Sequence, residues 1–275
     1  MKTIIVPTDF SPTATNAMNF AADMAMNINA SLMLLHVYQV PVSMTDVPVV
    51  LISADELKKD SERQLNEAKE SLTHITSGKV KIYTEAIMGD VADELEDVCN
   101  RIEPFAVVMG TKGTSGLERM LFGSTTLTAI RHLKWPVIVV PPGKEYGAGI
   151  KKIGFACDFD KVVENTPVQF IKNMVKAFNA ELHVLNVDYE NRHFKPETPE
   201  ESLMLQTLLE DLNPAYHFVN NKDIEDGINE FAETNNIDLL ITIPKKHSLL
   251  DGLFKHSSTK GLVMQSHVPV MCVHE

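Results

Sequence analysis

Residues 105–131 read FAVVMGTKGTSGLERMLFGSTTLTAIR, and this strand–loop–helix stretch is the most informative part of the chain. An apolar run ends at Met109, a glycine-rich loop follows, and Gly123 precedes hydroxyl side chains at an expected helix start. Glycines let the backbone approach a ligand closely and tolerate positive φ. Free N–H groups at the start of a helix favour anions. The stretch therefore predicts a phosphate cradle, and the alternative is a loop whose glycines serve only tight turns.

The residues on either side of this stretch alternate between strand and helix patterns. Ser11-Pro12 and the segment 53–56 (SADE) are typical of helix starts, the second as a capping box. This alternation predicts a parallel sheet with helices on both faces. The expected elements are strand 3–6, helix 12–28, strand 32–37, helix 53–76, strand 80–87, helix 91–102, strand 105–109, helix 124–133 and strand 137–140.

The second half of the chain repeats the first. Strand 153–156 and the acidic residue that follows it repeat the first strand and Asp9, and residues 198–201 (TPEE) predict another capping box. From Val91 and Ile224 onward the halves align without a gap, at a constant offset. We therefore expect an α/β protein with two tandem doubly wound domains, residues 1–143 and 150–275, joined by a Gly/Pro-rich segment.

The composition narrows the class of function. The chain has 275 residues, 44% of them hydrophobic, which is enough for a real core. Its formal net charge of −12 disfavours nucleic acid as a partner. Three cysteines without a CxxC pair fit a reducing cytoplasm and buried structural thiols. No apolar stretch is long enough for a membrane span, and the N-terminus is expected to be a strand rather than a signal peptide.

The spacing Gly110-x2-Gly113-x9-Gly123-Ser124 resembles the nucleotide-binding signature of the universal stress protein family, and the resemblance covers essentially the whole chain. It implies a five-stranded parallel sheet of order 3-2-1-4-5 in each half, with ATP or AMP at the carboxyl ends of the strands. The rule that ligands bind where the strand order reverses indicates the same place independently. Strands 1 and 4 are neighbours on either side of that reversal.

The resemblance also implies residue roles. Asp9 matches the acidic residue that contacts the nucleoside, although a charge favoured by the helix dipole would look the same. Val37 matches the strand-2 residue whose backbone lies along the adenine. Lys112 could reach a phosphate, or it is a solvated surface lysine. The expected nucleotide-binding residues are Pro7, Thr8, Asp9, Val37, Met109, Gly110, Lys112, Gly113, Gly123, Ser124 and Thr125.

The second half departs from this signature. Its residues at the three glycine positions are Ile243, Lys246 and His256, and Ala156 replaces Pro7. A β-branched side chain costs about 1–2 kcal/mol where positive φ is needed, and the added side chains fill the phosphate space. We therefore expect only the first half to bind the nucleotide, and we expect no metal site.

The leading hypothesis is an adenine-nucleotide-binding protein with a regulatory or protective role in the stress response. A slow ATPase or a phosphoryl- or nucleotidyl-transfer enzyme using the same site is the alternative, with Mg²⁺ bridging a bound triphosphate. No catalytic residue is assigned, because the P-loop motif and a Ser/His/Asp set are missing from the sequence. His36 is interpreted as a core histidine, since Asn186 occupies its place in the repeat. A scaffold with both sites silent stays open.

The last strand of each half carries no charge and is expected at a sheet edge. An uncharged edge is a pairing surface unless something covers it. Members of the family dimerise through this strand, so the tandem chain is expected to form an internal pseudo-dimer, with a homodimer as a further option.

Overall fold

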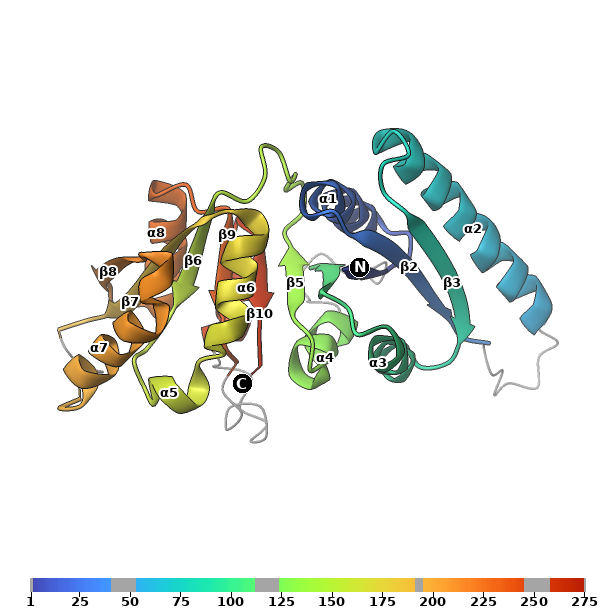
Figure 1. Cartoon of the computed structure of the whole chain (residues 1–275). Helices are drawn as coiled ribbons and strands as arrows, with labels where there is room; N and C mark the ends of the chain where they lie inside the picture. The colour runs from blue at the N-terminus through green and yellow to red at the C-terminus, as the bar shows by residue number, and fades with distance from the viewer. Residues whose placement is uncertain (1, 41–52, 112–123, 191–194, 245–257, 275) are drawn as a thin grey trace, which may run out of the picture.

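Strands and helices alternate along the chain in the computed structural model, which describes residues 2–40, 53–111, 124–190, 195–244 and 258–274 (Figure 1). The first half contains β1 (Thr3–Pro7), α1 (Pro12–Ile28), β2 (Ser31–Tyr38), α2 (Ala54–Ile75), β3 (Ile82–Met88), α3 (Val91–Ile102), β4 (Ala106–Gly110), α4 (Ser124–His132) and β5 (Val137–Val140). The second contains β6 (Lys152–Ala156), α5 (Val162–Asn165), α6 (Val168–Phe178), β7 (Glu181–Asp188), α7 (Thr198–Leu209), a 3₁₀ turn (Glu210–Leu212), β8 (Ala215–Asn220), α8 (Ile224–Thr234), β9 (Leu239–Thr242), α10 (Ser258–Gln265) and β10 (Val270–Cys272).

The strands form one sheet of ten, in the order β3-β2-β1-β4-β5-β10-β9-β6-β7-β8. The order within each half is 3-2-1-4-5, as the sequence predicted, and neighbouring strands within each half are parallel. The halves meet where β5 and β10 pair in antiparallel fashion, with Val137 opposite Cys272 and Val139 opposite Val270 (Figure 1). In this pairing the two uncharged edge strands supply each other's hydrogen-bond partners.

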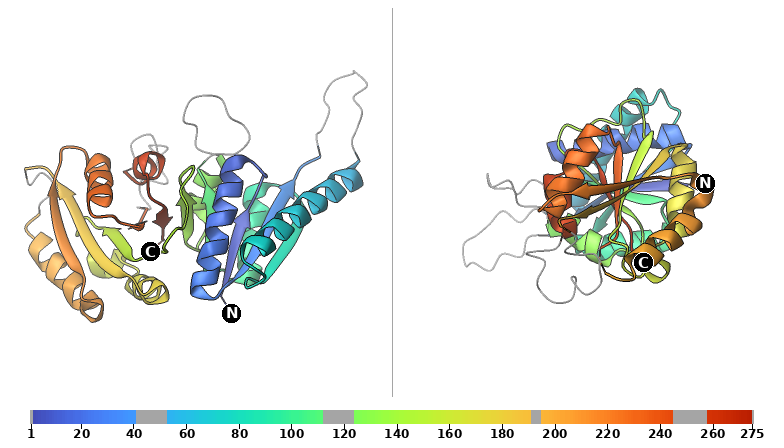
Figure 2. Two further views of the ribbon diagram at one scale, coloured as in Figure 1. Left: turned by 90° about the horizontal axis from the view of Figure 1, so that it is seen from above. Right: turned by 90° about the vertical axis from the view of Figure 1, so that its left-hand side faces the viewer.

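Helices cover both faces of the sheet, and each face has its own buried apolar cluster. Residues of α1, α2, α6 and α7 pack in one cluster, and residues of α3, α4, α8 and α10 pack in the other. The right-hand view in Figure 2 shows the strands crossing one another between these helices, as expected from the right-handed twist of strands. The sequences of the core strands are continuous apolar runs, because helices bury these strands on both faces of the sheet.

Side-chain caps explain where several helices begin. The Ser11 hydroxyl accepts from the Ala14 N–H at the start of α1, and Ser53 and Glu56 form the predicted capping box of α2. The capping box predicted at residues 198–201 is wrong. Glu201 instead accepts the Val162 N–H at 2.7 Å, so its carboxylate caps the start of α5.

The segment that joins the halves is docked on α1. Asn16 Nδ2 donates to the carbonyl oxygens of Pro141 at 3.2 Å and Lys144 at 3.3 Å. The Tyr146 hydroxyl donates to Asn27 Oδ1 at 3.0 Å, and its buried ring meets Phe20 edge to face. The sequence indicated only a Gly/Pro-rich joining segment, and these hydrogen bonds hold that segment against α1.

Candidate functional site

The turn between β1 and α1 forms one side of the candidate site. The Asp9 carboxylate accepts from the Ser11 N–H at 3.0 Å, and the buried Thr8 hydroxyl accepts from the Phe10 N–H at 3.0 Å. Phe10 has φ of 60°, in the left-handed region that a bulky side chain rarely adopts. These short bonds fix the path of the turn, with Asp9 half-buried at its centre.

His36 supports this turn from β2. Its Nδ1 donates to the Thr8 carbonyl oxygen at 2.7 Å, and its ring packs against Phe10 with centroids 4.7 Å apart. In the second half Asn186 Nδ2 donates to the Cys157 carbonyl oxygen at 2.9 Å, which is the same bond made by a different side chain. An amide replaces the imidazole without loss of this contact, so the geometry supports the structural interpretation of His36 over a catalytic one.

Gly110 at the end of β4 forms the other side of the site. A Cβ at this position would lie 2.7 Å from the Thr13 carbonyl oxygen in the first turn of α1. Gly110 is not among the glycines with positive φ, so its tolerance of that conformation does not explain the glycine here. The glycine is required by the close approach of two backbones. The second half has Ile243 at this place, and its first helix is broken into α5 and α6.

The sheet brings these two sides together. Ile4 lies beside Ala106 and Ile5 beside Val107, and continuing this register places Thr8 level with Gly110. The Gly110 carbonyl oxygen accepts from the Thr126 hydroxyl at 3.1 Å, which ties the end of β4 to the first turn of α4. The turn after β1, the end of β4 and the start of α4 therefore converge at the order reversal, where doubly wound sheets bind ligands.

The remaining predicted residues divide into three groups. Pro7 is half-buried at the end of β1, Val37 is half-buried near the end of β2, and the Met109 side chain is buried in the core. Thr125 lies half-buried in the first turn of α4, and Ser124 begins that helix. The predicted residues Lys112, Gly113 and Gly123 lie outside the described residues, as does the side chain of Ser124.

Thr111 is a candidate site residue that was not predicted from the sequence. It directly follows Gly110 and is 8% exposed, and its hydroxyl oxygen has no hydrogen-bond partner among the described residues. A buried hydroxyl without a partner is unusual in a folded protein. The signal in the sequence was a hydroxyl inside the glycine motif, opposite Pro244 in the repeat.

Two of the three cysteines, Cys99 and Cys272, are buried, and Cys157 is half-buried. None of the three forms a disulfide, and burial raises the pKa of Cys99 and of Cys272 to about 12. Cys157 is half-buried at the place of Thr8, where its Sγ accepts from the Phe159 N–H at 3.4 Å. Within the described ranges, no three His, Cys, Asp or Glu side chains gather as metal ligands.

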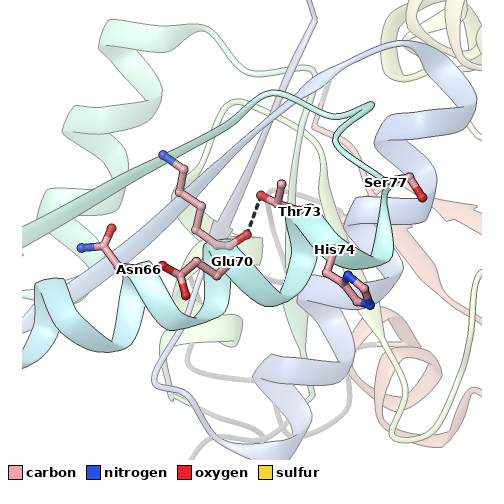
Figure 3. Close-up of a pocket in the computed structure, with 6 residues that line it drawn as sticks. Asn66, Glu70, Thr73, His74 and Ser77 are labelled. Atoms are coloured by element: carbon pink, nitrogen blue, oxygen red, sulfur yellow. Dashed lines mark hydrogen bonds between the residues drawn. The ribbon is translucent and has the colours of Figure 1, made fainter.

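Two surface hollows lie away from this site. One runs along the exposed face of α2, from Asn66 to Ser77, and all of its lining side chains come from α2 and the turn that follows it (Figure 3). The Thr73 hydroxyl there donates to the Lys69 carbonyl oxygen of its own helix at 2.7 Å. The other hollow lies between α1 and the joining segment. Neither involves the carboxyl end of β1 or β4.

Comparisons with known proteins agree on one family. The model of the universal stress protein family matches residues 1–141 and again residues 149–274. Universal stress protein MJ0531 of Methanocaldococcus jannaschii is 30% identical over 146 residues, which are 52% of this chain and 84% of that protein. Universal stress protein MJ0577 of the same organism is 29% identical over 160 residues, or 50% of this chain and 94% of that protein.

A solved structure matches the whole fold. The crystal structure of a universal stress protein from Archaeoglobus fulgidus superposes with a TM-score of 0.74 at 17% identity, covering 99% of this chain and 98% of that chain. At this identity the likeness concerns the fold, including the tandem arrangement. Separately, no helix in the described parts of the chain combines the length and apolar character that crossing a bilayer requires.

Proposed function

Because the chain belongs to the universal stress protein family, we propose that its first half binds an adenine nucleotide, ATP or AMP. The protein then acts in the stress response in a regulatory or protective role, without obligatory turnover. The observation that carries the proposal is the convergence of the Asp9 turn, the end of β4 and the start of α4 at the reversal of strand order.

The geometry of the described residues supports separate contacts for the ribose, the adenine and the phosphates. Asp9 stands where a carboxylate can accept hydrogen bonds from ribose hydroxyls, and Val37 offers its backbone near the end of the neighbouring strand for the adenine. The N–H groups at the start of α4 favour a phosphate. In this proposal Met109 and Gly110 flank the sugar, and the phosphates are held by Lys112, Gly113, Gly123, Ser124 and Thr125.

The unpartnered hydroxyl of Thr111 supports a ligand beside β4. Its oxygen is buried and has no hydrogen-bond partner in the described part of the chain. A polar ligand at the end of β4 supplies the kind of partner that such a group needs. Pro244 at the matching position offers no hydroxyl, in keeping with a second half that does not bind the nucleotide.

The proposal extends to the organisation of the chain. Residues 1–143 form the nucleotide-binding domain and residues 150–275 the degenerate one, and the β5–β10 pairing supports an internal pseudo-dimer. We place the protein in the cytoplasm, with Mg²⁺ accompanying a bound triphosphate. No described contact favours the alternative of an ATPase or transferase.

A matched pair of substitutions tests the site. The Asp9 and Asp158 carboxylates make the same local bond, to the Ser11 N–H at 3.0 Å and the Asp160 N–H at 3.1 Å. Asp9→Ala and Asp158→Ala therefore remove the same turn contact. Titration calorimetry with ATP and AMP measures the affinity of each variant and of the parent protein.

We expect Asp9→Ala to weaken binding by about 10-fold or more, since hydrogen bonds to charged groups contribute about 1.5–3 kcal/mol. Asp158→Ala is expected to bind like the parent chain. Equal losses in the two variants, or a loss in Asp158→Ala alone, would contradict the assignment. ATP turnover that is lost with Asp9→Ala would instead favour the enzyme.

A further inference from the structure

Helix α4 makes a tertiary hydrogen bond near each of its ends, and the two bonding partners come from different halves of the chain. Near its start the Thr126 hydroxyl donates to the Gly110 carbonyl oxygen at 3.1 Å. Near its end the Ile130 carbonyl oxygen accepts from His274 Nε2 at 2.7 Å, and His274 belongs to the second half. The contact joins residues 144 positions apart.

The Ile130 carbonyl is one that needs an outside partner. Its partner within a continuing helix would be the N–H four residues later, at Lys134, but α4 ends at His132. A carbonyl oxygen can only accept, so the Nε2–H of His274 donates and satisfies it. Histidine near a helix C-terminus also suits the negative end of the helix dipole.

The antiparallel pairing of the last strands brings His274 to this place. Cys272 at the end of β10 lies opposite Val137 at the start of β5. The chain that leaves β10 therefore runs toward the short connection between α4 and β5. The contact is a direct consequence of how the two halves share one sheet.

The residue that the repeat aligns with His274 cannot make the same contact in the other direction. The repeat aligns His274 with Pro141 and Ile130 with Val263, at the same offset as the rest of this region. Proline has no side-chain donor, so Pro141 cannot make the reciprocal bond. Pro141 therefore gives α10 no matching cap, whereas α4, in the half that keeps the glycine signature, receives one from His274.

We propose that His274 is a positioning residue for the nucleotide site and that the degenerate half supports α4 through it. This inference rests on the proposed function, because the start of α4 is the end that faces the phosphates. Fixing α4 between Gly110 and His274 pre-organises its N–H groups for an anion. Since coupling between sites is reciprocal, a bound nucleotide stabilises the β10 contact in return.

The test uses the full chain with three substitutions. His274→Ala removes the donor, and His274→Gln keeps an N–H₂ donor of similar reach. His267→Ala is the matched control, because His267 precedes β10 and is exposed, with Nε2 3.7 Å from Glu233. Two measurements follow for each protein: calorimetric affinity for ATP, and amide hydrogen exchange of α4 with and without ATP.

We expect His274→Ala to weaken ATP binding about two- to tenfold and to speed amide exchange in the last turn of α4 by a similar factor without ligand. His274→Gln is expected to restore both toward the parent values, and His267→Ala to change neither. In the parent chain, ATP is expected to slow amide hydrogen exchange in the C-terminal peptide that contains residue 274. This effect is expected to disappear in His274→Ala.

The outcomes separate this inference from the proposed function. Parent protein that binds no adenine nucleotide overturns the proposed function and this inference with it, whereas the ligand-free exchange of α4 still reports whether the cap exists. Parent protein that binds ATP, together with a His274→Ala variant of unchanged affinity, overturns the positioning role alone. Faster α4 exchange with unchanged affinity overturns that role as well, since the cap is then purely structural.

Discussion

Gly110→Ala tests the close approach on which the geometry of the site depends. The added Cβ would lie 2.7 Å from the Thr13 carbonyl oxygen and 3.0 Å from the Thr13 carbonyl carbon, and both are backbone atoms. An ordinary contact needs at least 3.4 Å, so α1 and β4 have to separate by about 0.7 Å. No side-chain rotation can relieve the overlap.

Overpacking of this kind costs about 1–3 kcal/mol of unfolding free energy. For a domain of this size each kcal/mol lowers Tm by about 2–4 °C, so we expect a drop of about 2–12 °C. Thermal unfolding followed by circular dichroism measures the change. The matched control is Gly154→Ala, in β6, where the nearest atom is a Leu240 methyl carbon at 2.9 Å.

Leu240 can move its side-chain end, and alanine is favoured over glycine in a strand by about 0.5–1 kcal/mol. We therefore expect Gly154→Ala to stay within about 1 kcal/mol of the parent protein. A Gly110→Ala variant as stable as its parent, or a Gly154→Ala variant equally destabilised, would refute the argument that two backbones limit position 110.

Two further predictions concern titratable groups. Burial and the neighbouring His183, whose Nδ1 lies 3.1 Å from His217 Nε2, lower the pKa of His217. Because the pKa of His217 is lower in the folded protein, the unfolded chain binds the proton more readily, and the unfolding free energy falls as the pH drops below about 6.5. We expect the unfolding free energy of His217→Gln, measured by denaturation, to fall less between pH 7 and pH 5 than that of the parent protein. Equal losses would exclude this role. A thiol reagent at pH 8 should label Cys157 before Cys99 and Cys272, whose pKa values of about 12 and burial keep them protonated; mass spectrometry of peptides checks the order, and early labelling of Cys99 would contradict it.

The fold was predictable from the sequence because its signals are local and occur twice. The apolar runs, the helix caps at Ser11 and Ser53, and the ungapped repeat each indicated the same alternation of strand and helix. The strand order followed from the family resemblance, and the structure confirms it in both halves. The domain boundaries at residues 143 and 150 stay predictions.

What the sequence could not show depends on contacts between distant residues. Glu201 had the spacing of a helix cap, yet its carboxylate serves another helix, α5, 39 residues away. Gly110 was predicted as part of a ligand motif, but a side chain is excluded there because the backbone of Thr13 lies too close. The His274 contact could not be predicted, because it depends on how β5 and β10 pair.

The candidate site was predicted in part. The sequence indicated that the ends of β1 and β4 converge, and the register of these strands confirms it. The role of each nucleotide-binding residue stays a prediction, and Lys112, Gly113 and Gly123 lie outside the described residues. Thr111 was missed because its burial and its lack of a partner within the described residues are visible only in three dimensions.

The most direct test of the central claim is the number of adenine nucleotides that one chain holds. Purified protein is saturated with ATP, freed of excess, denatured by heat, and its released nucleotide is quantified by chromatography against protein concentration. We predict about one equivalent per chain, because the second half has side chains where the first has glycines. Two equivalents would contradict the difference between the halves, and none would contradict nucleotide binding altogether.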